Sequence, residues 1–163
     1  MDVNQLLEAW RTNNRITLFL LDEISDDGLS CTLSRRGGRD VARQFAHLHD
    51  VRLYHLGERA PDLAEGLEPF QVKARPPVSP DRETLKAALT ESGEAMEAFL
   101  RGVAEGSDAG LRRRGFKKGI FTTLAYFIAH ESHHRGSILL TLKQCGHAVD
   151  RSSAYRIWDW DRM

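Results

Sequence analysis

The stretch TTLAYFIAHESHHRGSILLTLKQ, residues 122–144, has the pattern of one long amphipathic helix. Its apolar side chains recur at spacings that place them on one helical face. The residues that carry this pattern are Leu124, Ile128, Ile138 and Leu142. Gly146 follows, and glycine commonly ends helices. We therefore predict a helix from about Thr122 to Gln144, long enough to span a helical bundle.

The same stretch contains H-E-x-x-H at residues 130–134. In zinc peptidases this spacing places two metal ligands and a general base on one helix. A third ligand is needed, and the metzincin position, six residues after the second histidine, holds Leu140. No glutamate follows Glu131 that would serve as the third ligand of other zincins. A peptidase is therefore disfavoured, and a third ligand is better sought upstream.

Three further stretches have helical periodicity: residues 3–24, 40–56 and 80–103. Asp40 is placed to cap the second helix, and Ser79 followed by Pro80 to begin the third. The long connection 57–78 allows the second and third helices to run parallel. The sequence thus predicts one all-α domain over residues 1–163, an up-down-down-up four-helix bundle. The single candidate for strands is a short hairpin at 116–121.

Charge and composition limit the classes of partner. The chain has 163 residues, with 23 Lys and Arg against 23 Asp and Glu, so no net charge attracts it to nucleic acid or to an anionic membrane. The N-terminus lacks the basic start and unbroken apolar stretch of a signal peptide, and we expect a cytoplasmic protein. Cys31 and Cys145 are distant in sequence and too few for a disulfide framework, so we expect two reduced thiols.

His130 and His134 lie one helical turn apart, and burying two imidazoles at one point favours a metal site over two hydrogen-bonded core histidines. His133 points to another side of the helix and is not expected to be a ligand. The second predicted helix offers His47, His49 and His55. Hydrophobic periodicity leaves His47 and His49 on opposite flanks of the apolar stripe and does not choose between them.

The chain resembles the DinB/YfiT-like proteins. In that family a stretch like S-V-x-x-x-x-x-H-L-x-D on the second helix and H-x-x-x-H followed by R-G on the fourth supply a metal site in a four-helix bundle. Here Asp40 stands in the place of the serine, and Val41, His47-Leu48 and Asp50 follow in register. His130, His134, Arg135 and Gly136 match the second motif. The ending GHAVDRSSAYRIWDWDRM is similar to the W-x-W tail of some members. The resemblance covers the whole chain and implies His47, His130 and His134 as the ligands.

The resemblance also implies an activity. Several members are metal-dependent transferases or isomerases that use a low-molecular-weight thiol. We therefore expect a small-molecule substrate and a bound Zn²⁺ or Ni²⁺ ion, and we expect the protein to form a homodimer. Glu131 is a candidate general base or a hydrogen-bond partner that supports a ligand, and Arg135 a second candidate catalytic residue; a Glu131–Arg135 ion pair at i, i+4 is the favoured interpretation. The alternative function is a non-catalytic, metal-binding stress-response bundle.

Two other features have simple interpretations. The basic run Arg112, Arg113, Arg114, Lys117 and Lys118 is typical of a solvated turn, although it would also attract a carboxylate-bearing thiol. Trp158 and Trp160 are expected to cover the core or a dimer contact rather than to bind a ligand.

Overall fold

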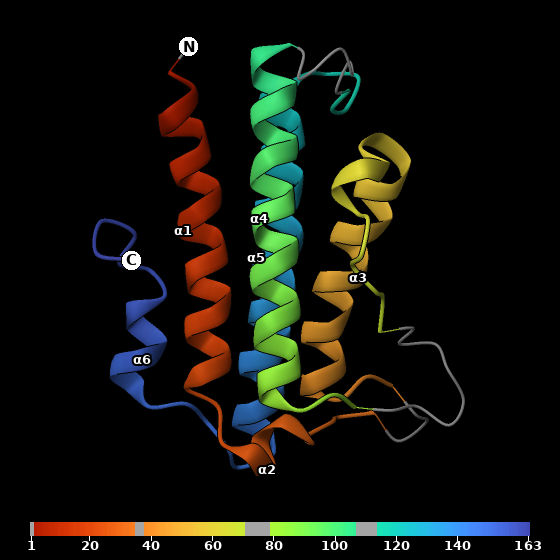
Figure 1. The fold of residues 1–163 in the computed structure, drawn as a ribbon. Coiled ribbons are helices and arrows are strands. Elements are labelled where there is room, and N and C mark those ends of the chain that lie inside the picture. The colour runs from red at the N-terminus through yellow and green to blue at the C-terminus, as the bar shows by residue number, and fades with distance from the viewer. Residues whose placement is uncertain (1, 35–37, 71–78, 107–113) are drawn as a thin grey trace.

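The structure, a computed structural model, describes residues 2–34, 38–70, 79–106 and 114–163. Four long helices dominate it: α1 (Val3–Asp22), α3 (Val41–Arg59), α4 (Arg82–Glu105) and α5 (Ile120–Gln144). Three short helices accompany them: α2 (Asp26–Leu29), the 3₁₀ helix η1 (Pro61–Leu63) and α6 (Arg151–Arg156). The four long helices stand side by side as a bundle (Figure 1).

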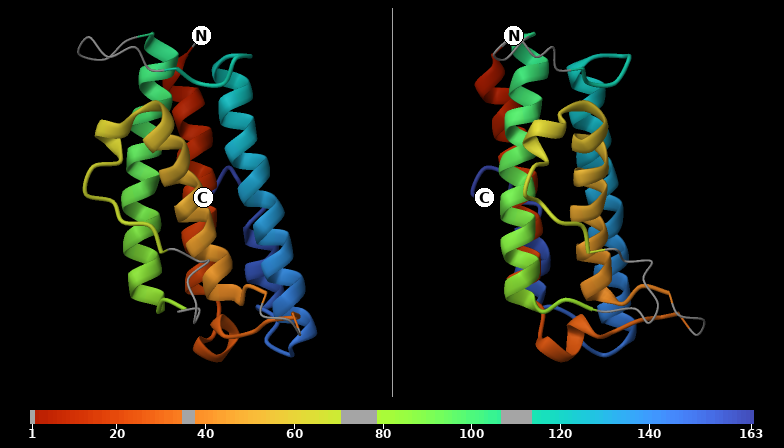
Figure 2. Two further views of the ribbon diagram at one scale, coloured as in Figure 1. Left: turned by 90° about the vertical axis from the view of Figure 1, so that its right-hand side faces the viewer. Right: turned by 45° about the vertical axis from the view of Figure 1, so that its right-hand side comes forward.

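The directions of the long helices agree with the prediction. In Figure 1, α1 and α5 run down the page and α3 and α4 run up it, which is an up-down-down-up bundle. Figure 2 shows the same arrangement from two other sides. Helices α1 and α3 each pack against both α4 and α5. Helices α3 and α5 are therefore antiparallel neighbours, and side chains from both can meet between them.

Aspartate side chains begin three of the four long helices. Asp2, Asp40 and Asp81 each accept hydrogen bonds from backbone N–H groups of the first turn, which the helix itself leaves without partners. The predicted cap at Ser79 is wrong. The Ser79 hydroxyl instead donates to the Asp40 carboxylate, so the start of α4 is tied to the start of α3.

The predicted hairpin at 116–121 is also wrong, because the described residues contain no strand there. The backbone N–H of Gly119 donates to the carbonyl oxygen of Phe116 at 2.9 Å and closes a turn. Gly119 has a φ of 94°, a left-handed conformation that favours glycine. Helix α5 begins directly afterwards, two residues earlier than expected.

The bundle interior has two apolar regions. One gathers Leu20, Leu21, Phe45, Leu89 and Ile138 among others, near the ends where α3 and α4 begin. The other gathers Trp10, Leu56, Phe99 and Phe127 among others, nearer the opposite end. Along each long helix, buried polar residues separate the part that enters one apolar region from the part that enters the other. Together they form a buried polar layer: Asn13 and Thr17 on α1, Arg52 on α3, Ser92 on α4, Glu131 and Arg135 on α5.

The C-terminal segment packs on the outside of the bundle. Ile157 is buried, and the guanidinium of Arg156 lies 4.9 Å from the ring centroid of Phe19. The indole of Trp158 is 75% exposed and that of Trp160 is 38% exposed. Ile157, and not the exposed Trp158, therefore covers the core in this segment. A contact of the tryptophans with a second chain in a dimer remains a prediction.

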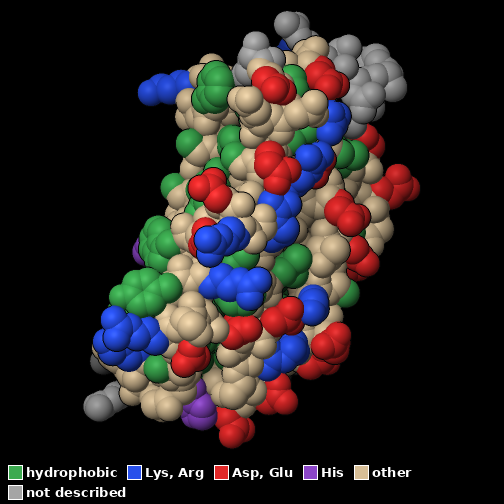
Figure 3. Space-filling model, turned by 90° about the vertical axis from the view of Figure 1, so that its left-hand side faces the viewer, with side chains coloured by type: hydrophobic (Ala, Val, Ile, Leu, Met, Phe, Trp, Pro, Cys, Tyr) green, Lys and Arg blue, Asp and Glu red, His purple; other side chains and the backbone are tan. Residues whose placement is uncertain are grey.

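Acidic and basic side chains alternate over the side of the molecule that carries α1 and α6 (Figure 3). Ion pairs account for part of this pattern, including Arg11 with Glu97 and Arg15 with Glu8. Arg112 and Arg113 of the basic run lie outside the described residues. Within the described parts of the chain, no helix has both the length and the apolar character that crossing a bilayer requires.

Candidate metal centre

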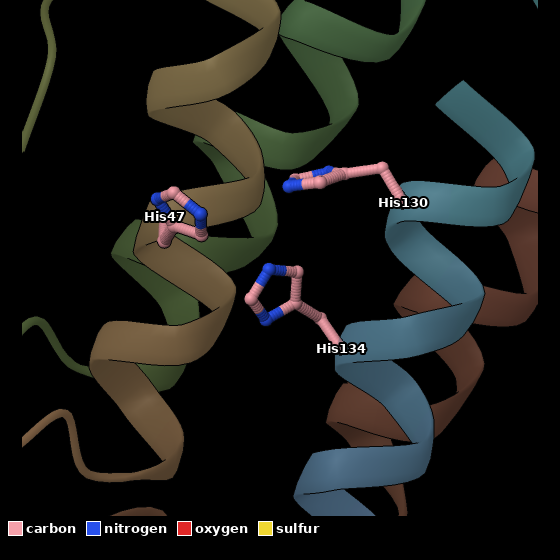
Figure 4. Close-up of side chains that lie close together, drawn as sticks. All are labelled: His47, His130 and His134. Atoms are coloured by element: carbon pink, nitrogen blue, oxygen red, sulfur yellow. The ribbon is translucent and has the colours of Figure 1, made fainter. Parts of the chain in front are cut away.

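Three histidines converge between α3 and α5. His47 comes from α3, and His130 and His134 come from successive turns of α5 (Figure 4). One ring nitrogen from each lies within 4.8 Å of the others. The ring centroids of His47 and His134 are 4.8 Å apart, and those of His130 and His134 are 4.7 Å apart. The three rings are partly buried, so they are shielded on one side and reachable from the other.

The local sequence explains this convergence. Asp40 fixes the first residue of α3, and His47 follows almost two turns later on the side that faces α5. His130 and His134 are four residues apart, so they share one side of α5. Because α3 and α5 are neighbours, these two sides meet.

His49 does not join this group. Its side chain is 1% exposed and faces the other way, toward α4 and the connection after η1. Nδ1 lies 3.0 Å from the Ala88 carbonyl oxygen, and Nε2 lies 3.1 Å from the Glu68 carbonyl oxygen. Burial lowers the pKa of His49, and the two carbonyl contacts oppose that effect. His49 thus holds the long connection against the bundle.

The other histidines also lie outside the group. His133 is exposed, with its ring centroid 5.3 Å from that of His134. His55 packs among Phe116, Tyr126 and Phe127. His147 lies beyond the end of α5, with its Nδ1 3.4 Å from the Ser25 hydroxyl.

Burial favours the neutral form of His130 and His134. Burial, together with the neighbouring His130 and His47, lowers the pKa of His134 to about 4. Burial also lowers the pKa of His130. Neutral imidazoles are the form that binds metal ions. Neither of these two rings has a hydrogen bond to another residue in the described part of the chain.

Glu131 lies in the polar layer and not beside the three ring nitrogens. One carboxylate oxygen accepts from Nε of Arg52 at 2.8 Å. The other accepts from the Asn13 amide at 2.7 Å and the Thr17 hydroxyl at 3.2 Å. The zincin arrangement needs this glutamate at the metal-bound water, so the placement argues further against a peptidase. Both oxygens have donors, which fits a supporting role better than that of a general base.

Arg135 completes the same layer. Its guanidinium lies 3.7 Å from the Glu131 carboxylate, donates to the Thr17 hydroxyl at 2.8 Å and donates to the Asn13 side-chain oxygen at 2.9 Å. Burial lowers the pKa of Arg135, and the Glu131 charge opposes that effect. The expected i, i+4 ion pair is present, but Arg52 is the closer cation to Glu131.

Sequence patterns alone missed the parts of this layer that come from α1 and α3. Asn13 belongs to a polar patch that weakens the helical pattern of residues 3–24, and Arg52 interrupts the apolar pattern of α3. Both are almost fully buried. A charged residue within the apolar pattern of a helix, such as Arg52, could have indicated a buried ion pair. Its partner, Glu131, could not be identified without the packing of α3 against α5.

An open cleft adjoins the histidines on the side of His134. Its volume is about 330 Å³. All but one of the residues that line it have polar side chains: Thr32, Leu33, Ser34, Arg39, Gln44, His133, His134, Ser137 and Thr141. The Gln44 side chain is only 7% exposed and has no hydrogen bond to a described residue, so its amide remains available to a bound molecule.

The donor set fits a divalent transition-metal ion. Three imidazoles suit such ions, and a ligand group drawn from three residues leaves further coordination positions for small molecules. Among the described residues, no cysteine, aspartate or glutamate joins the three histidines as a fourth donor. The geometry therefore has the character of an open site.

The fold and these side chains define a helical bundle with a three-histidine candidate metal site shared by α3 and α5. The model of the DinB family matches residues 1–160, and the chain belongs to that family. Comparisons with curated proteins and with solved structures give no significant match.

Proposed function

We propose that this DinB-family protein is a divalent-metal-dependent enzyme that activates a low-molecular-weight thiol or a water molecule for transfer to, or hydrolysis of, a small electrophile. Zn²⁺ or Ni²⁺ is the proposed ion, held by His47, His130 and His134. The observation that carries the proposal is the convergence of three ring nitrogens beside an open polar cleft, with no fourth protein donor among the residues that the structure describes.

A bound dication would supply a Lewis acid that lowers the pKa of a thiol or of water, so that its anion is present near neutral pH. The residues of the chain have separate tasks. The packing of α3 against α5 holds the three imidazoles in place. In the cleft, the Arg39 cation favours a substrate or thiol with an anionic group, and the Gln44 amide is placed to orient it.

Glu131 and Arg135 have a positioning role in this proposal. Each directly follows a metal-binding histidine on α5, and each is hydrogen-bonded to α1 or α3 through Asn13, Thr17 or Arg52. These bonds fix how far α5 is rotated, and the rotation decides where His130 and His134 point.

The proposed activity is tested with metal-loaded protein, a panel of low-molecular-weight thiols and the fluorogenic electrophile monochlorobimane. We expect metal-dependent turnover with at least one thiol, lost on chelation and restored by Zn²⁺ or Ni²⁺. The control variant is His147→Ala, which removes a histidine beyond the end of α5 and leaves the three clustered rings and the cleft lining intact. Turnover that is equal in wild type and His130→Ala would contradict the proposal.

X-ray absorption on the metal-loaded protein separates an enzyme from a bundle with a structural ion. Structural sites have four protein ligands, whereas catalytic sites keep a position for solvent or substrate. We expect three imidazole ligands and at least one light ligand from solvent. A fourth protein ligand, from any part of the chain, would support the non-catalytic alternative.

A further inference from the structure

The two cysteines, distant in sequence, lie together at one end of the bundle. Cys31 follows α2, and Cys145 caps the C-terminal end of α5, directly after Gln144. The Sγ atom of Cys145 lies 4.0 Å from the carbonyl oxygen of Thr32, the residue bonded to Cys31. The Sγ atom of Cys31 lies 3.7 Å from the Asp27 carbonyl oxygen.

The thiols also act on each other. Burial raises the pKa of Cys31, and the neighbouring Cys145 thiol adds to the rise. Both side chains are partly exposed, so a small reagent can reach them. The backbone is fixed at both positions, because the Cys31 N–H donates to Gly28, the Cys31 carbonyl accepts from Val41, and the Cys145 N–H donates to Thr141. Helices α2, α3 and α5 therefore hold the two cysteines near each other, and their proximity does not depend on one loop alone.

From this geometry we propose that Cys31 and Cys145 form a reversible intramolecular disulfide on exchange with a low-molecular-weight disulfide. The thiolate of one cysteine attacks the small disulfide, forms a mixed disulfide and releases one small thiol. The thiolate of the second cysteine then attacks the protein sulfur of the mixed disulfide and releases the other small thiol. The two cysteines lose two protons and two electrons, and the small disulfide is reduced to two thiols.

The bond would affect the segment that forms one wall of the cleft. Thr32, Leu33 and Ser34, which directly follow Cys31, line the cleft together with His134. A disulfide to Cys145 would fasten this wall to the end of the helix that carries His130 and His134. The oxidation state of the pair would thus set how freely the wall moves relative to the histidines.

The disulfide also predicts a change in stability. It would close a loop of roughly 110 residues, and loops of this length give a large restriction of the unfolded chain. For a protein of this size we expect the Tm of the oxidised form to exceed that of the reduced form by at least roughly 5 °C. Hydrogen exchange of the amides at residues 31–34 should slow in the oxidised form, since their segment gains a second attachment.

The test treats the full-length protein with oxidised glutathione, alkylates the remaining thiols with a maleimide and measures the intact mass. We expect a product lighter than the reduced protein by two hydrogen atoms, without alkylation, and restored to two free thiols by dithiothreitol. Peptide mapping should find Cys31 joined to Cys145. The matched variants Cys31→Ser and Cys145→Ser should each carry one glutathione and show no rise in Tm on oxidation.

Three results would overturn the proposal. Wild-type protein with a glutathione on each cysteine would show that the sulfur atoms do not reach each other. Two thiols that remain open to alkylation would show that exchange does not proceed. A disulfide between two chains in place of the internal one would assign the cysteines to a different contact.

Discussion

Removal of the Glu131 side chain tests the account of the polar layer most directly. The carboxylate is 1% exposed and is the only acidic group among the residues of the layer described above. It faces Arg52, also 1% exposed, at 2.8 Å and Arg135 at 3.7 Å. In Glu131→Ala the two guanidiniums would remain buried without their counter-charge, and the Asn13 amide would lose its acceptor.

The magnitude follows from these contacts. Breaking a buried ion pair by removal of one partner costs about 3 to 5 kcal/mol, because a buried charge is left uncompensated. The lost amide and hydroxyl acceptors add to this, although such contributions are not additive. We expect Glu131→Ala to lower the free energy of unfolding by about 4 kcal/mol, and the Tm by roughly 8 to 16 °C.

The pair Arg11–Glu97 provides a matched control. Its geometry is as good, with the Arg11 Nε donating at 2.8 Å to one carboxylate oxygen and Nη2 donating at 2.6 Å to the other. It differs in exposure, because the side chains are 36% and 25% exposed. Ion pairs in contact with solvent contribute about 1 kcal/mol or less. Glu97→Ala should therefore cost no more than roughly a quarter of the loss in Glu131→Ala.

Urea denaturation followed by circular dichroism measures both variants, with a chelator present so that metal binding does not contribute. Burial alone would raise the pKa of Glu131, but the charge of Arg52 and hydrogen bonds from Arg52 and Asn13 outweigh it, so the net pKa is lowered. A lowered folded pKa gives stability that is present above the ordinary carboxyl pKa of about 4.3 and lost as pH falls through the folded value. Equal losses in Glu131→Ala and Glu97→Ala at pH 7 would refute the reasoning.

Three further predictions concern the metal site and assembly. His47→Ala should lose most of the bound metal, whereas His49→Ala should retain close to one equivalent and lower the Tm, because the buried His49 ring contacts the Ala88 and Glu68 carbonyl groups away from the site. Metal analysis showing the opposite pattern would reassign the ligand from α3. Burial and, to a smaller extent, the neighbouring histidines lower the pKa of His134 to about 4, so protons compete only weakly with the metal ion for this ring. A pH titration followed by metal analysis should therefore show release of the metal below pH 6 and not above it. Light scattering should give twice the chain mass of 18.4 kDa, with dissociation favoured in Trp158→Ala because that indole is exposed in the isolated chain; a wild-type mass near 18.4 kDa would contradict the dimer.

The buried layer also bears on the histidines that precede two of its members. Glu131 directly follows His130, and Arg135 directly follows His134. A change that frees α5 to rotate would move both imidazoles with respect to His47. Loss of metal affinity in Glu131→Ala, measured under conditions where the variant remains folded, would therefore accompany its loss of stability.

The sequence alone predicted the four long helices, because apolar spacing and a cap such as Asp40 act within a few residues of the chain. It also placed His130 and His134 on one side of α5, since a four-residue separation has that consequence in any helix. The resemblance to a family favoured His47, and the structure places His47 with those two rings. Periodicity could not distinguish His47 from His49, because both flank the apolar stripe.

Only the tertiary structure decided which distant side chains meet. The hydrophobic pattern specifies which side of a helix is buried but not its partner across the bundle, and that partner depends on the rotation and axial offset of each helix. Glu131 therefore showed its local partner, Arg135, in the sequence, while its closer partner, Arg52, emerged only when α3 packed against α5. The same holds for Cys31 and Cys145: nothing local relates them, and their proximity follows from the position of α2 at the end of the bundle where α5 terminates.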